Sequence, residues 1–125
     1  MNERIRVLLV DDHEIVREGV RAVLEDERDI EVVGEAGDGQ QALERVRTLS
    51  PDVVLLDLVM PGPKAPDTIK AIREASPGTQ ILMLTSFAED AQVRETIGAG
   101  AIGYLLKDVL KNDLARAVRT ARAGR

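Results

Sequence analysis

Short apolar runs alternate with amphipathic stretches along the whole chain. The runs are rich in Val, Ile and Leu on both faces, which is typical of parallel strands covered by helices on either side. The pattern predicts five strands, at residues 5–10, 31–36, 53–56, 80–84 and 102–106. Apolar residues at helical spacing predict five helices. In chain order they cover residues 13–27, residues 41–49, a stretch through Ile69 and Ile72 to about residue 75, residues 88–99, and the residues from about 110 onwards.

This alternation predicts the α/β class, with a parallel sheet and right-handed crossovers. We expect one doubly wound domain over residues 1–125, a flavodoxin-like (βα)5 fold with strand order 2-1-3-4-5. The order is inferred from the fold class alone. Charged Glu31 and Glu35 favour a sheet edge for the second strand. Further local predictions are a loop holding Pro61, Pro63 and Pro66, solvent-facing Arg17, Glu18, Arg21 and Glu25, and core-facing Val93 and Ile97.

Composition limits the possible functions. The 125 residues are 44% hydrophobic and 31% charged, as in an ordinary soluble domain. Absence of cysteine excludes disulfides, thiolate metal sites and cysteine nucleophiles, and no apolar run is long enough to cross a bilayer. We therefore expect a cytoplasmic protein without membrane contact. The net charge of −5 argues against direct nucleic-acid binding by this segment.

Polar residues follow the predicted strands where those strands end. Asp11 and Asp12 follow the first strand, Asp57 the third, Thr85 the fourth and Lys107 the fifth. Open α/β sheets bind ligands at this edge. Three carboxylates would repel one another there, and a divalent cation would remove that repulsion. Oxygen ligands favour Mg²⁺, or alternatively Mn²⁺. The interpretation that competes with a metal site is that these aspartates, Asp12 included, cap the helices that follow them.

Carboxylates, a metal, a hydroxyl and a lysine are the groups that phosphoryl transfer needs. Asp57 is the best candidate nucleophile, and its attack would give an acyl phosphate, with Asp11 and Asp12 holding the metal. A hydrolase of the aspartyl-phosphate type would need an aspartate at position 59, which is Val59. Gly98, Gly100 and Gly103 spell G-x-G-x-x-G, but they close a predicted helix, so we expect a helix C-cap instead of a dinucleotide site.

Four separated motifs, VLLVDDHEIVREGV, VVLLDLVMPG, ILMLTSF and GYLLKD, resemble those of response-regulator receiver domains, especially the NarL/FixJ subfamily. The resemblance covers essentially the whole chain. It implies that Asp57 accepts a phosphoryl group from a phosphohistidine on a sensor histidine kinase. Such a domain is a regulatory phosphoacceptor that catalyses only its own phosphorylation and dephosphorylation. A stand-alone or phosphorylation-independent receiver, acting as an interaction module, is the alternative.

The resemblance also implies roles for individual residues. Asp12 would bind Mg²⁺ directly, Asp11 largely through water, and the backbone carbonyl of Val59 would be a further ligand. Thr85 would hydrogen-bond the phosphoryl group, and Lys107 would pair with it. Tyr104 occupies the aromatic switch position, and the less favoured alternative is an ordinary half-buried strand residue. His13, the only histidine, is expected to be a surface residue, and Pro63-Lys64-Ala65-Pro66 departs from the usual Met-Asp-Gly continuation.

Partners follow from the subfamily. Its members usually carry a C-terminal LuxR-type helix-turn-helix output domain, so we expect this chain to be the regulatory part of a transcription factor, with a phosphorylation-linked homodimer. Residues 111–125 hold five basic side chains against one acidic one. These basic residues could complement the dipole of the last helix, or they could contact the output domain or a second receiver.

Overall fold

Five strands form one parallel sheet in the computed structural model, which describes residues 4–57, 64–85, 90–106 and 110–124. The strands are β1 (Ile5–Val10), β2 (Ile30–Ala36), β3 (Val53–Asp57), β4 (Gln80–Thr85) and β5 (Gly103–Leu106). Their order is β2-β1-β3-β4-β5, with every neighbouring pair parallel. The predicted flavodoxin-like order is confirmed, and β2 lies at an edge as its charged residues suggested.

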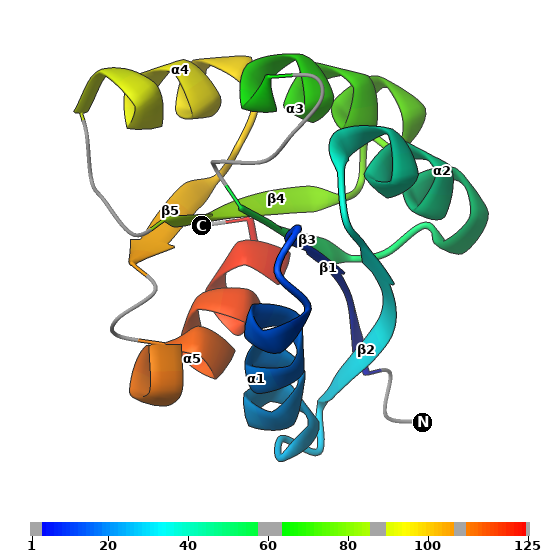
Figure 1. Ribbon diagram of the computed structural model, residues 1–125, viewed down its shortest axis with the longest axis vertical. Helices are drawn as coiled ribbons and strands as arrows, with labels where there is room; N and C mark the ends of the chain where they lie inside the picture. The colour runs from blue at the N-terminus through cyan, green and yellow to red at the C-terminus, as the bar shows by residue number, and fades with distance from the viewer. Residues whose placement is uncertain (1–3, 58–63, 86–89, 107–109, 125) are drawn as a thin grey trace.

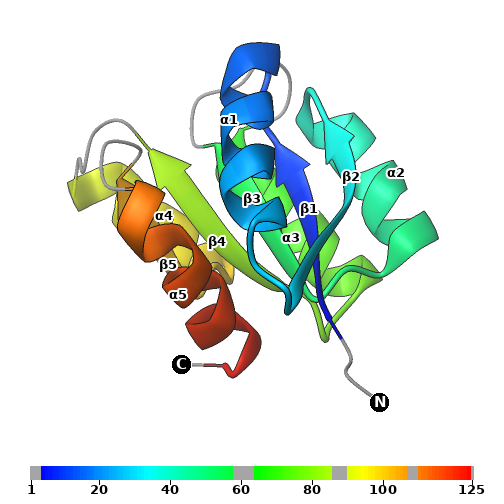
Figure 2. The same cartoon turned by 90° about the horizontal axis from the view of Figure 1, so that it is seen from below.

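Helices cover both faces of the sheet. Within the described residues they are α1 (Glu14–Glu25), α2 (Gly39–Leu49), α3 (Ala65–Ala75), α4 (Asp90–Ala99) and α5 (Leu110–Arg122). Figures 1 and 2 show α1 and α5 on one face, and α2, α3 and α4 on the other. None of these helices combines the length and the apolar character that a membrane span requires.

Alternate residues of each inner strand belong to two separate hydrophobic clusters. In β1, Val7 and Leu9 pack towards α1 and α5, whereas Leu8 and Val10 pack towards α2 and α3. Successive side chains of a strand point to opposite faces, so a strand covered on both sides must be apolar at every position. This is why the buried strands read as unbroken apolar runs in the sequence.

Two predictions about the helices α3 and α4 were wrong. α3 begins at Ala65, so Pro66 lies in its first turn and not in the preceding loop; proline fits there because the first N–H groups of a helix have no intrahelical partner. Pro61 and Pro63 lie outside the described residues. Ile97 is 42% exposed, and Thr96, at 1%, is the buried residue of that turn of α4. The side chain of Val93 is likewise outside the described part.

The glycines after α4 form a helix terminus, as the sequence predicted. Gly100 has φ of +125°, its N–H donates to the carbonyl of Ile97, and the N–H of Ala101 donates to the carbonyl of Thr96. This pairing is the Schellman arrangement, which places a glycine in a left-handed conformation just after the helix. The G-x-G-x-x-G pattern therefore ends a helix and leads into β5.

Two glycines offer a matched test of the packing between α2 and α3. A Cβ added to Gly39 would lie 2.5 Å from Oγ1 of the buried, β-branched Thr68, whereas one added to Gly19 on the exposed side of α1 meets nothing within 4 Å. We expect Gly39→Ala to lower the free energy of unfolding by about 1–3 kcal/mol, and Gly19→Ala to raise it by about 0.5–1 kcal/mol. Urea denaturation would measure the free energy of unfolding of both variants. Equal changes in the two variants would contradict the tight contact between α2 and α3.

Candidate functional site

Two neighbouring strands of the sheet end in aspartate. Asp57 is the last residue of β3, and Asp11 directly follows β1; the two strands pair with Val10 opposite Leu56. The register therefore brings both carboxyl groups to the same edge of the sheet. Asp11 and Asp57 are 3% and 4% exposed. An aspartate this deeply buried needs a compensating interaction, because burial disfavours the charged form.

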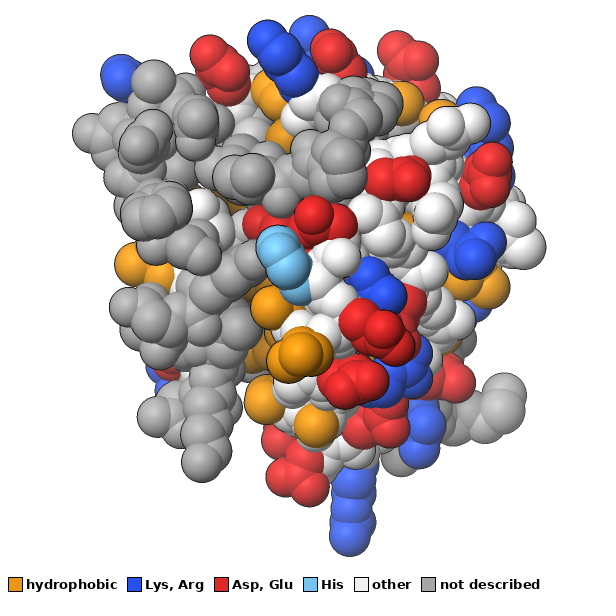
Figure 3. All heavy atoms as spheres, in the orientation of Figure 1, with side chains coloured by type: hydrophobic (Ala, Val, Ile, Leu, Met, Phe, Trp, Pro, Cys, Tyr) orange, Lys and Arg blue, Asp and Glu red, His pale blue; other side chains and the backbone are white. Residues whose placement is uncertain are grey.

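Four side chains meet at this edge, in a group that we call the acidic pocket: Asp11, Asp12, His13 and Asp57. Each offers a ligand atom, and these atoms all lie within 4.8 Å of one another. Figure 3 shows acidic side chains on this face with the histidine beside them. The structure thus brings together the three aspartates singled out by sequence, and it adds His13, which the sequence analysis had placed simply at the surface.

The acidic pocket has the donor set of a divalent cation site. Three carboxylates at this separation repel one another, and a bound cation offsets that repulsion. Carboxylate oxygens are the ligands that Mg²⁺ and Mn²⁺ prefer. The alternative that Asp12 caps α1 is wrong: the N-cap residue is His13, and no side chain caps that helix end. Instead, a carboxylate oxygen of Asp11 accepts a hydrogen bond from the His13 N–H at 2.9 Å.

The remaining predicted site residues lie around the same edge where the structure describes them. Thr85 ends β4, one residue beyond Leu84, which pairs with Asp57. Thr85 is 3% exposed and pairs in turn with Leu106, the last residue of β5. Lys107 and Val59 lie outside the described residues.

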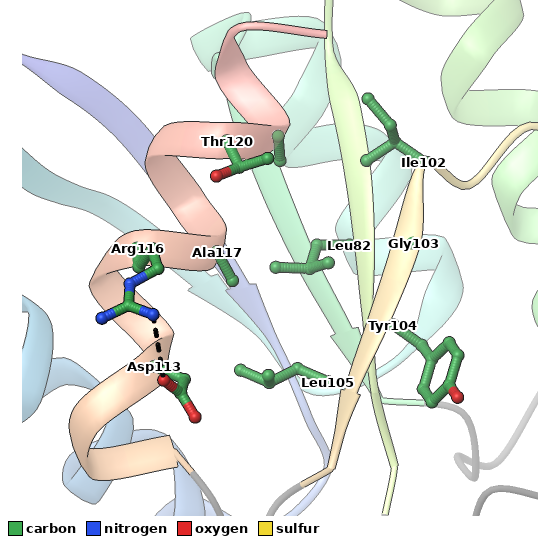
Figure 4. Close-up of a pocket in the computed structure, with 10 residues that line it drawn as sticks. Leu82, Ile102, Gly103, Tyr104, Leu105, Asp113, Arg116, Ala117 and Thr120 are labelled. Carbon is green, nitrogen blue, oxygen red and sulfur yellow. Dashed lines mark ion pairs between the residues drawn. The ribbon is translucent and has the colours of Figure 1, made fainter. Parts of the chain in front are cut away.

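Tyr104 lies on β5, and its side chain is 45% exposed. Figure 4 shows it pointing away from α5, while Leu105 points towards that helix. Between β5 and α5 lies a largely apolar groove of about 320 Å³ whose rim carries Asp113 and Arg116.

An arginine pair ties the acidic pocket to the edge strand. Arg17 donates to the backbone carbonyl of Asp11 and, at 2.9 Å, to the Glu35 carboxylate on β2. Arg21, one turn later, also donates to Glu35 at 2.9 Å. Sequence analysis predicted that both arginines face solvent; the Arg21 side chain is 37% exposed as expected, whereas the Arg17 side chain, which also contacts Asp11, is only 19% exposed. The i, i+4 spacing of the arginines was visible, but their acceptor is identified only once β2 is known to lie beside α1.

The hydrogen bonds of this network shift the pKa values of its members. Burial raises the pKa of Glu35, but hydrogen bonds from Arg21 and Arg17 outweigh it and hold that pKa below its usual value. The hydrogen bond from Arg21 to Glu35 correspondingly raises the pKa of Arg21. Glu35 is thus an ionised carboxylate at neutral pH, and it fixes the arginine that supports Asp11.

The basic residues of α5 are partly engaged within the domain. Arg119 pairs with Asp29 at 2.7 Å and also with Glu27, in the turn between α1 and β2. The Arg119 hydrogen bond lowers the pKa of Asp29, and both acidic partners raise the pKa of Arg119. Arg116 lies 3.9 Å from Asp113. The last helix therefore does not present all of its positive charge to a partner.

Comparison with known proteins gives a consistent result. Residues 7–119 match the response regulator receiver domain family. The chain is 48% identical over 120 residues to the transcriptional regulatory protein LiaR of Bacillus subtilis, and 42% identical over 120 residues to the response regulator protein VraR of Staphylococcus aureus. Each alignment covers 96% of this chain and 57% of the relative. The chain thus spans little more than half the length of these curated relatives.

Solved structures show the same fold. The signal receiver domain of NarL from Mycobacterium tuberculosis superposes with a TM-score of 0.93 at 39% identity, covering 98% of this chain and 99% of that one. The isolated receiver domain of RcsB from Salmonella enterica serovar Typhimurium, solved in the presence of the phosphomimetic BeF3⁻, gives a TM-score of 0.86 at 30% identity. That alignment covers 98% of this chain and 91% of the RcsB domain.

The Glu35 network predicts a pH-dependent stability. Glu35→Gln should lower the free energy of unfolding by about 1 kcal/mol at neutral pH, because both arginines lose a charged acceptor. A lowered pKa in the folded state means that Glu35 contributes stability above the unfolded-state pKa and loses it as the pH falls through the folded-state pKa. The difference in free energy of unfolding between wild type and variant should therefore be constant near neutral pH and narrow as the pH falls below about 5. Urea titrations would measure it.

The exposed Glu31 on the same strand provides the control, since Glu31→Gln removes a carboxylate outside this network. If the free energies of unfolding of wild type and Glu35→Gln differed by the same amount at acidic and at neutral pH, the stabilising role assigned to ionised Glu35 would be contradicted.

Proposed function

The chain belongs to the response regulator receiver domain family, among the two-component regulators of the LuxR/NarL type, and on that premise we propose that Asp57 accepts a phosphoryl group in a Mg²⁺-dependent reaction. The donor is a phosphohistidine on a sensor histidine kinase. The observation that carries the proposal is the acidic pocket itself, where a buried aspartate at the end of a central strand lies among two further carboxylates.

Position distinguishes Asp57 from the other two aspartates as the phosphoryl acceptor. A carboxylate oxygen of Asp11 accepts the His13 N–H and lies 3.2 Å from Nδ1 of the His13 ring. Asp12 is exposed and lies 3.1 Å from the same Nδ1. Asp57 ends a central strand: it pairs with Leu84 of β4, and the preceding residue, Leu56, pairs with Val10 of β1. Such fixed placement favours in-line attack on an incoming phosphorus.

The reaction forms one bond and breaks another. A carboxylate oxygen of Asp57 attacks phosphorus, the P–N bond to the donor imidazole breaks, and the imidazole nitrogen leaves with the electron pair and takes up a proton. Asp11 and Asp12 would hold Mg²⁺, with the carbonyl of Val59 as a further ligand. When bound, Mg²⁺ supplies positive charge beside the phosphoryl oxygens. Lys107 would pair with one phosphoryl oxygen, and the Thr85 hydroxyl would donate to another.

The same residues suggest how the signal leaves the site. Thr85 pairs with Leu106, and Tyr104 lies two residues earlier on β5, on the same side of the strand. A hydrogen bond from Thr85 to a phosphoryl oxygen would therefore act on the strand that carries the exposed Tyr104 and borders the groove against α5. We infer that this shift promotes homodimerisation and controls a helix-turn-helix output domain in a longer protein, and hence transcription.

The phosphoacceptor assignment predicts the mass of the labelled protein. Incubation with Mg²⁺ and phosphoramidate should add the mass of one phosphoryl group to the wild type, and chelation of the metal should prevent it. Asp57→Asn should abolish labelling because an amide oxygen is too weak a nucleophile, whereas Asp67→Asn, at an exposed position in the first turn of α3, should be labelled like the wild type. Intact-mass spectrometry reads all four samples. Equal labelling of Asp57→Asn would disprove the assignment.

If Thr85 is part of the switch, its substitution should prevent dimerisation without preventing phosphorylation of Asp57. Thr85→Ala should still accept the phosphoryl group on Asp57, but the labelled variant should sediment as a monomer where the labelled wild type forms a dimer. Analytical ultracentrifugation before and after labelling measures this difference. A labelled Thr85→Ala that dimerises like the wild type would remove Thr85 from the switch.

A further inference from the structure

His13 is turned towards the acidic pocket. It is the N-cap residue of α1, with φ of −101° and ψ of 110°, yet its side chain makes no capping hydrogen bond. Its ring nitrogen Nδ1 instead lies 3.2 Å from Oδ1 of Asp11 and 3.1 Å from Oδ1 of Asp12. The backbone N–H of His13 donates to the same oxygen of Asp11 at 2.9 Å, which fixes the residue that carries the ring.

These separations match neighbouring ligands on one metal ion. With metal–ligand bonds of about 2.1 Å in an octahedral shell, adjacent donor atoms lie about 3.0 Å apart. Nδ1 of His13 is at that spacing from each of the two aspartate oxygens, and an Asp57 oxygen falls within the same 4.8 Å group. A cation held by the aspartates would therefore have the imidazole nitrogen at coordinating distance.

We propose that Nδ1 of His13 is a further ligand of the metal bound in the acidic pocket, and that it gives this site a preference for imidazole-binding divalent metals, Mn²⁺, Co²⁺ and Ni²⁺, over Mg²⁺. The inference rests on the proposed function, which places a divalent cation among the aspartates. Mg²⁺ is a hard ion that selects oxygen ligands, whereas imidazole suits the later first-row metals, in the order Mn²⁺ < Co²⁺ < Ni²⁺.

The exposure of the His13 ring allows Nδ1 to exchange its contacts with the aspartates for a bond to the metal. The His13 side chain is 67% exposed, so the ring can carry its single proton on Nε2 while the lone pair on Nδ1 faces the metal. The bonds from Nδ1 to Asp11 and Asp12 are then replaced by one bond from nitrogen to the metal, and both carboxylate oxygens remain available as ligands. No change in Asp57 is required.

Electron spin-echo envelope modulation on Mn²⁺ bound to the 125-residue chain tests the inference without any phosphorylation assay. The wild type should show modulation from a directly coordinated ¹⁴N nucleus. His13→Phe keeps a ring at the position but removes both nitrogens, and it should lose this modulation. Glu14→Gln, at the neighbouring exposed position, alters the local charge and should keep the ¹⁴N modulation.

Metal affinities give an independent measure. His13→Phe should bind Ni²⁺ and Mn²⁺ roughly tenfold more weakly than the wild type, with Mg²⁺ affinity unchanged. Bound Mn²⁺ without nitrogen modulation, or an unchanged ratio of Ni²⁺ to Mg²⁺ affinity in His13→Phe, would overturn the role of His13 and leave the proposed function standing. Failure of the wild type to bind any of these metals would overturn both. Because His13 is exposed, circular dichroism of the variant should match that of the wild type.

Discussion

The register between β1 and β3 is the constraint on which the site depends. Hydrogen bonds along the two strands set Val10 opposite Leu56, so the next residues along each strand, Asp11 and Asp57, are held close together at one edge. Neither can move away without breaking a strand that is packed on both faces. Mutual repulsion between the carboxylates is therefore built into the fold, and a cation is the simplest means of relieving it.

A second set of contacts keeps that edge in place from outside the sheet. Arg17 holds the backbone carbonyl of Asp11, while Glu35 on the edge strand holds Arg17 and Arg21. Exposed ion pairs each contribute little to stability. Here their importance is positional, because they link the segment that carries Asp11 and Asp12 to both α1 and β2. The two aspartates that we propose as metal ligands are thus supported by a neighbouring helix and strand as well as by their own chain segment.

The fold was largely predictable from the sequence because its strands are buried on both faces. Unbroken apolar runs marked β1, β3 and β4, and the strand ends in turn marked Asp11, Asp57 and Thr85. Features that depend on how two distant elements meet were not predictable. The Arg17–Glu35 pair requires α1 beside the edge strand, and the approach of His13 to the aspartates depends on backbone angles at one N-cap. Ile97 was misplaced because α4 is only weakly amphipathic.

One face of the sheet is completed by the two ends of the chain. Val20 and Leu24 of α1 share a hydrophobic cluster with Leu114 and Val118 of α5, and Arg119 reaches residues of the α1–β2 turn some 90 positions earlier in the sequence. During synthesis, α1 leaves the ribosome long before α5 exists. The sheet covers part of the apolar side of α1, but the part that packs against Leu114 and Val118 stays exposed until α5 has been synthesised. The synthesis of α5 therefore sets when this face of the nascent domain is protected from aggregation and proteolysis.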